Sequence, residues 1–150
     1  MPRRIAVRGI ILLNDQLLCA RLYAYHRGGR TPNNWWRLPG GGLEENEALR
    51  DGVHREMIEE TGVAPVVGNL LFVQQFSDQL SEYLEFFFHI VNAADYVQTD
   101  LATTTHGLKE IAELQFCNPS SIRLLPEFLT TEPLSELIAA NQAPIIISRL

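Results

Sequence analysis

The segment from Gly40 to Val63, GGGLEENEALRDGVHREMIEETGV, constrains this chain of 150 residues more than any other. Three glycines directly precede a stretch of helical character that carries Glu56, Glu59 and Glu60. At spacings of three and four residues these carboxylates share one helical face, where like charges destabilise a helix by roughly 0.2–0.5 kcal/mol per pair. We therefore expect a counter-charge, and Mg²⁺ commonly binds carboxylates together with substrate phosphates. The segment is interpreted as a site for metal ions and phosphates.

Two further features of the segment favour a bound ligand. The run from Gly40 to Gly42 lets the backbone approach a ligand without side-chain obstruction. Gly52 lies in or beside the acidic sector of the helix, where glycine costs about 1 kcal/mol relative to alanine. We interpret Gly52 as clearance for a phosphate or its metal ions. An apolar stripe at one edge of the sector can face the core; it consists of Leu49, Val53 and Met57.

The spacing of these residues resembles the Nudix box of the Nudix hydrolases. All fixed positions of that pattern are present: Gly41, Glu47, Arg55, Glu56, Glu59, Glu60 and Gly62. Met57 and Val63 fill the two positions that require a bulky aliphatic residue. The box covers roughly a sixth of the chain, but so many fixed positions make it a specific motif. The resemblance implies a MutT-like pyrophosphohydrolase that cleaves a nucleoside diphosphate linked to another moiety.

The resemblance also implies roles for individual residues. The implied ligands of Mg²⁺, or of Mn²⁺ in its place, are Glu56, Glu59, Glu60 and the carbonyl of Gly40. The implied catalytic set is Glu56, Glu59, Arg55 and Glu47. Within this set, Arg55 and Glu47 resemble a supporting pair that orients the ligands.

The base that activates the attacking water is left open by the sequence. Cleavage of a phosphoanhydride requires such a water together with charge neutralisation. Glu56 or Glu59 can act as the base from the helix. The distal candidates are Glu110 and Glu113, which flank the start of a late strand. An exposed, solvated face is at least as good an interpretation of these two.

Candidates for substrate contact lie before or next to the glycine run. Trp35 can stack on a base, and Arg27 and Arg37 can contact a base or phosphates. Ordinary packing, or a solvated loop charge, is the better explanation of each of them when taken alone. One tryptophan of the pair Trp35 and Trp36 is expected to pack in the core.

Composition limits the class of protein and its partners. A net charge of −6 argues against nucleic-acid binding through a basic surface, and no apolar run reaches the ~18 residues of a membrane span. Cys19 and Cys117 are expected to be buried, unpaired thiols. We expect a cytoplasmic protein with a nucleotide or nucleotide-conjugate substrate, no nucleic-acid partner and no membrane association. The sequence leaves a homodimer open.

Residue patterns predict one α+β domain over residues 1–150. Strands are predicted at 4–13, 16–22, 66–76, 82–91, 111–117 and 144–148. Helices are predicted at 46–61, with Asn46 as N-cap and Gly62 as the C-terminal stop, and at 119–129 and 134–140. Loops are predicted at 25–34 and 94–107. The family resemblance implies that these elements form an α/β/α sandwich with a mixed sheet.

Three functional hypotheses compete at this point. The first is an active hydrolase of a nucleoside triphosphate, a nucleotide sugar such as ADP-ribose, or a dinucleoside polyphosphate. The second is a catalytically inactive, ligand-sensing Nudix-like domain, which is expected to have lost box acids or to carry a DNA-binding segment. The third, a structural protein with a charged surface helix, leaves the acidic cluster and its glycine turn unexplained. Because all box acids are present, the sequence favours the hydrolase.

Overall fold

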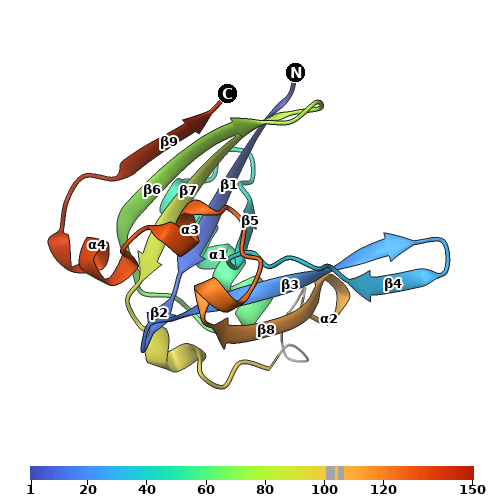
Figure 1. The fold of residues 1–150 in the computed structure, drawn as a ribbon, viewed down its shortest axis with the longest axis horizontal. Coiled ribbons are helices and arrows are strands. Elements are labelled where there is room, and N and C mark those ends of the chain that lie inside the picture. Colours follow the sequence, from blue (N-terminus) through green and yellow to red (C-terminus); the bar gives the residue numbers. More distant parts are fainter. Residues whose placement is uncertain (101–103, 105–106) are drawn as a thin grey trace.

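The structure is a computed structural model that describes residues 1–100, 104 and 107–150. Its larger sheet has five strands in the order β5-β1-β7-β6-β9 (Figure 1). In that order the strands are Gly40–Gly42, Arg3–Ile10, Glu82–Ile90, Val67–Ser77 and Ile145–Arg149. Strand β1 is parallel to β7 and antiparallel to β5, whereas β6 is antiparallel to β7 and parallel to β9. The sheet is mixed, and β9, which confirms the strand predicted at 144–148, lies at its edge.

A smaller antiparallel sheet is built around β3. Its strands β2, β3, β4 and β8 are Leu12–Leu13, Gln16–His26, Gly29–Pro32 and Ile111–Cys117. The β3–β4 hairpin projects from the body as an arm (Figure 1). The loop predicted at 25–34 is therefore wrong in part. Tyr23 and Tyr25 continue the ladder, the guanidinium of Arg30 lies 4.0 Å from the Tyr23 ring centroid, and the chain reverses at Arg27 and Gly28.

Helices cover both faces of the larger sheet. The helices of the described chain are α1 (Leu49–Thr61), α2 (Gly107–Glu110), α3 (Phe128–Thr131) and α4 (Leu134–Ala140), with short 3₁₀ helices η1 (Ala93–Tyr96) and η3 (Pro119–Ser121). Helix α1 packs on one face of the sheet, and α3 and α4 lie on the other (Figure 1). This arrangement confirms the α/β/α sandwich. Within the described residues, no helix combines the length and apolarity needed to span a bilayer.

The core consists of two clusters, one on each face of the sheet. Successive residues of β7 alternate between them, because side chains of a strand point to opposite faces. Phe87 packs with Phe72 and Phe128 on the face of α3, and Phe88 packs with the cluster beneath α1. Val53, with Met57, lies in that second cluster, as the apolar stripe of the helix predicts.

The start of α1 differs from the prediction, whereas its end agrees. Asn46 adopts a left-handed conformation (φ 61°), and the helix begins at Leu49 with Ala48 as the cap residue. The side chain of Glu47 accepts the backbone N–H of Glu44 at 3.1 Å, so these residues form a turn before the helix. Gly62 stops the helix in the left-handed conformation, as predicted.

The helix predicted at 119–129 is largely wrong. Only η3 and the first residues of α3 are helical in this range. The backbone between them pairs with Trp36, whose N–H donates to Arg123 and whose carbonyl accepts from Leu125. These bonds replace the helical ones. Helix α4 is confirmed; the loop predicted at 94–107 is wrong at its start, where it overlaps η1, and it includes residues outside those described.

The glycine turn provides a test of how β5 is held. Gly40 has φ +142°, and a Cβ there would lie 2.0 Å from the carbonyl oxygen of Val7 on β1. We expect Gly40→Ala to lower the free energy of unfolding by at least about 2 kcal/mol, because the backbone of β1 or β5 would have to move to admit the methyl group. Gly42→Ala is the matched control, since no atom lies within 4 Å of its Cβ position. Urea unfolding measures both, and equal stability of the two variants would contradict this account.

Candidate active site

A cleft of about 440 Å³ lies between the glycine turn of β5 and the acidic face of α1. It brings together residues from the turn, from α1 and from the end of α2. Its lining residues are Arg37, Gly40, Gly41, Gly42, Glu44, Arg55, Glu56, Glu59, Glu60 and Glu110. Five carboxylates therefore face two guanidinium groups, and the cleft keeps an excess of negative charge.

The guanidinium of Arg55 connects the parts of this cleft. Its Nε and Nη2 donate to the two oxygens of Glu47 at 2.8 and 2.9 Å, and Nη2 also donates to the carbonyl of Gly42 at 3.0 Å. Its Nη1 donates to Glu56 at 2.9 Å and to Glu59 at 3.0 Å. The bond from Arg55 lowers the pKa of Glu47, and the bond to Glu47 raises the pKa of Arg55. Arg55 thus supplies part of the counter-charge that the sequence attributes to a cation.

Glu60 joins α1 to the glycine turn. Its side chain is almost fully buried, and it accepts the N–H of Gly40 at 2.9 Å and Nη2 of Arg37 at 2.8 Å. Burial raises the pKa of Glu60, against the opposing effects of Arg37 and of the Gly40 N–H. Burial likewise lowers the pKa of Arg37, to about 10. Glu60 therefore fixes both the turn and the position of Arg37.

Glycine at position 41 is required by the carboxylate of Glu56. A Cβ at Gly41 would lie 2.7 Å from both oxygens of Glu56. Glu56 is only 7% exposed, and this burial raises the pKa of its carboxyl group.

The clearance predicted at Gly52 has a different cause. A Cβ on Gly52 would meet Cδ1 of Leu43 at 2.5 Å and Oε1 of Glu47 at 3.0 Å. The missing side chain makes room for the turn before α1, and not for a phosphate. The predicted role of Gly52 in ligand clearance is therefore wrong.

The donor set fits a hard divalent cation that completes its coordination from the substrate and water. Within the described part of the chain, no three His, Cys, Asp or Glu side chains are arranged to hold a metal ion by themselves. Mg²⁺ is usually held by one or two carboxylates plus water and phosphate oxygens. Glu56 and Glu59 meet this requirement, because one oxygen of each lies within 3.0 Å of the same Nη1 of Arg55.

The two distal candidates lie in different surroundings. Glu110, at the end of α2, lines the cleft and makes no hydrogen bond or ion pair with any other described residue. Glu113 forms an ion pair with Arg21 across the β3–β8 ladder. The structure therefore brings Glu110, and not Glu113, to the acidic cluster.

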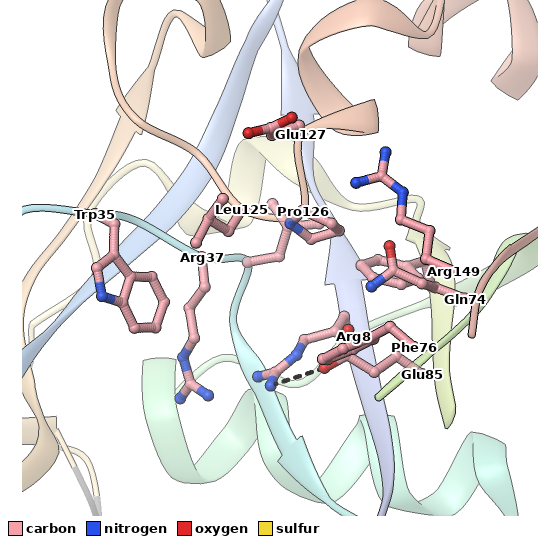
Figure 2. A pocket seen from close by; sticks show the side chains of 12 residues that line it. Arg8, Trp35, Arg37, Gln74, Phe76, Glu85, Leu125, Pro126, Glu127 and Arg149 are labelled. Carbon is pink, nitrogen blue, oxygen red and sulfur yellow. Dashed lines mark ion pairs between the residues drawn. The ribbon is translucent and has the colours of Figure 1, made fainter. Parts of the chain in front are cut away.

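The candidates for substrate contact also separate. Arg37 lines both the cleft and an adjoining cavity of about 380 Å³, and Trp35 lines that cavity (Figure 2). Trp36 is buried in the core beside Leu124, as predicted for one tryptophan of the pair. Arg27 lies in the turn between β3 and β4 and lines neither cavity.

Sequence reasoning missed several residues of the two cavities. Glu44 lies at the edge of the cleft, 3.6 Å from Nε of Arg55. The adjoining cavity contains Arg8, Gln74, Glu85 and Arg149 (Figure 2). No local motif marks these residues. The available indication was a polar residue within an apolar strand, as in LLFVQQF and YLEFFF.

The fold and the site define a Nudix domain. A model of the NUDIX domain family matches residues 2–138, so the chain belongs to this family. Nudix hydrolases use divalent metal ions and act on nucleotide-conjugate substrates. An RNA pyrophosphohydrolase of Pasteurella multocida is 30% identical over 69 residues, which cover 45% of this chain and 31% of the relative. A MutT-like protein of Streptomyces ambofaciens is 39% identical over 66 residues, which cover 44% of this chain and 38% of the relative.

A solved structure extends the likeness along the chain. The solution structure of the Escherichia coli ORF135 protein has a TM-score of 0.69 and 23% sequence identity, and the match covers 95% of this chain and 96% of that one. At this identity the likeness concerns the fold. The first curated relatives are matched over only about a third of their own length.

The raised pKa of Glu56 predicts how stability depends on pH. Burial raises this pKa above its ordinary value of 4.5, so the folded state binds the proton more tightly than the unfolded chain. This tighter proton binding stabilises the folded state fully below pH 4.5. The stabilisation is lost as the pH rises through the pKa of Glu56 in the folded state. We therefore expect metal-free Glu56→Gln to have a higher Tm than the wild type at pH 8, with the difference shrinking towards pH 4.5.

Thermal unfolding across this pH range, in the presence of a chelator, measures the difference. Glu45→Gln makes the same change of charge at an exposed position outside the cleft, and is the control. A Glu56→Gln variant that is less stable than the wild type at pH 8 would contradict the predicted cost of burying this carboxylate.

Proposed function

We propose that this protein is a metal-dependent hydrolase that cleaves the pyrophosphate bond of a nucleoside diphosphate linked to another moiety. Nucleoside triphosphates and nucleotide sugars belong to this class. The observation that carries the proposal is the convergence of Glu56 and Glu59 on one nitrogen of Arg55, beside the glycine turn. A cleft with excess carboxylates repels a polyphosphate unless cations lie between the two.

The box residues would divide into ligands and supports. Glu56 and Glu59 would hold Mg²⁺, or Mn²⁺, and we assign Glu60 and the carbonyl of Gly40 to the same ligand set. When bound, such an ion neutralises charge on the phosphate oxygens and lowers the pKa of a bound water. Arg55 and Glu47 would keep the helix carboxylates in position through their paired hydrogen bonds.

We further propose that Glu110 is the base that takes the proton of the attacking water. Glu56 and Glu59 already accept hydrogen bonds from Arg55, whereas Glu110 lines the cleft with no such bond among the described residues. Arg37 would contact the phosphates, because it borders both cavities and is held by Glu60.

The substrate is proposed to be a free nucleotide or nucleotide conjugate in the cytoplasm. The relative named an RNA pyrophosphohydrolase suggests pyrophosphate cleavage on a nucleic acid as an alternative. The net charge of −6 favours the small substrate, because a nucleic acid needs a basic surface along its backbone. A homodimer stays a prediction.

A nucleotide panel with variants of α1 tests the class of reaction. The panel comprises triphosphates, nucleotide sugars and dinucleoside polyphosphates, assayed with Mg²⁺ and with chelator. We expect chelator to abolish turnover and Glu59→Gln to lower kcat by at least about 100-fold. The exposed control Glu45→Gln should retain wild-type kcat. Tight nucleotide binding without turnover of any substrate would instead favour the ligand-sensing domain.

A second pair of variants tests the base. We expect Glu110→Gln to lower kcat by about 100-fold or more with little change in KM, because the group acts on water rather than on substrate binding. Glu113→Gln is the matched control on the same segment, since Glu113 is paired with Arg21 outside the cleft. If Glu110→Gln keeps wild-type kcat, the base must lie on α1.

A further inference from the structure

Three polar side chains on neighbouring strands form a row in the cavity next to the cleft. They are Arg8 on β1, Glu85 on β7 and Gln74 on β6, so they follow one another across the sheet (Figure 2). Gln74 and Glu85 are cross-strand partners, and Nη2 of Arg8 lies 3.5 Å from Oε1 of Glu85. Gln74 is only 4% exposed and Glu85 only 9%. Buried polar groups of this kind are rare on a sheet face that packs a core.

The row contains hydrogen-bonding atoms without partners. Nη1 of Arg8 and Oε1 of Gln74 are buried, and neither has a hydrogen-bond partner among the described residues. Nε of Arg37, at the border with the cleft, is also buried and has no hydrogen-bond partner among the described residues. Because buried polar atoms are nearly always paired, these atoms indicate that a polar ligand completes them.

The walls of the cavity suit a flat, aromatic ligand. Trp35, Phe76 and Pro126 line it beside the polar row (Figure 2). A cavity of about 380 Å³ with apolar walls and a few converging polar groups is typical of a small-molecule site. Arg37 borders both this cavity and the acidic cleft. A ligand in the cavity can therefore continue into the cleft.

We infer that the cavity binds the base of the nucleotide, and that the base is guanine. The row presents a donor, an acceptor and an acceptor in turn: Nη1 of Arg8, the carboxylate of Glu85 and Oε1 of Gln74. Guanine has the complementary edge, because its O6 accepts while its neighbouring N1–H and N2–H donate. Adenine, cytosine and uracil each lack two adjacent donor positions on this edge. The inference rests on the proposed function, because it assigns the phosphates to the cleft.

Binding of nucleoside monophosphates without metal tests the inference separately from catalysis. Calorimetry with GMP, AMP, CMP and UMP, in the presence of chelator, gives four affinities that do not depend on turnover. We expect GMP to bind at least about tenfold more tightly than each of the others. Glu85→Gln should reduce the affinity for GMP by about tenfold or more, and should change the affinity for AMP far less.

Two further variants keep this test decisive. Glu82→Gln removes a charge from the same strand at a partly exposed position outside the cavity that pairs with Arg3, and should leave all four affinities unchanged. If Glu85→Gln does not fold because Arg8 has lost its partner, Gln74→Leu is used in place of Glu85→Gln. This variant should weaken GMP binding several-fold, while GMP remains preferred over AMP and CMP through Glu85.

The outcomes separate this inference from the proposed function. Equal affinities for the four bases, or a preference for adenine, cytosine or uracil, would overturn the guanine assignment even if Mg²⁺-dependent hydrolysis is observed. A clear preference for GMP that is lost in Glu85→Gln supports the assignment, and it does so even if no nucleotide is hydrolysed. In that last case only the proposed hydrolase activity fails.

Discussion

The hydrogen bonds of the Arg55 guanidinium are the interaction on which the rest of the site depends. They join the carbonyl of Gly42 in the turn, the side chain of Glu47 before the helix, and Glu56 and Glu59 on the helix. A planar group with five N–H donors can bind carboxylates in this forked manner, and a lysine cannot. Since the turn and the helix are separate elements, Arg55 sets how closely they approach, together with the bond from the Gly40 N–H to Glu60.

The same bonds change how the acidic helix is explained. Taken from the sequence alone, the repulsion between the glutamates predicts a bound cation that offsets it. In the structure Arg55 offsets part of it for Glu56 and Glu59, and Arg37 does so for Glu60. The repulsion alone therefore does not demand a metal ion. The case for a metal rests on two other observations: carboxylates still outnumber guanidinium groups in the cleft, and two carboxylates converge on one point.

Sequence predicted the parts of this molecule that depend on local spacing. The acidic face of α1 and its stop at Gly62 follow from helical periodicity and from the conformational freedom of glycine. Local spacing does not predict contacts between segments that are distant in the sequence. Glu110 and Glu113 look alike in the sequence, and only the β3–β8 pairing gives one of them to Arg21. The polar row of the second cavity likewise joins Arg8 on β1 to Gln74 and Glu85 on the β6–β7 pair, which lies much later in the chain.

A crystal structure with Mn²⁺ and a non-hydrolysable nucleotide would test the central claim most directly, because anomalous scattering locates the metal. The claim is that α1 and the glycine turn form a metal–phosphate site. It predicts Mn²⁺ at the carboxylates of Glu56 and Glu59, in contact with the phosphates, with Arg55 still paired to Glu47. A nucleotide bound with no metal on this face of α1, or with its phosphates outside the cleft, would contradict it.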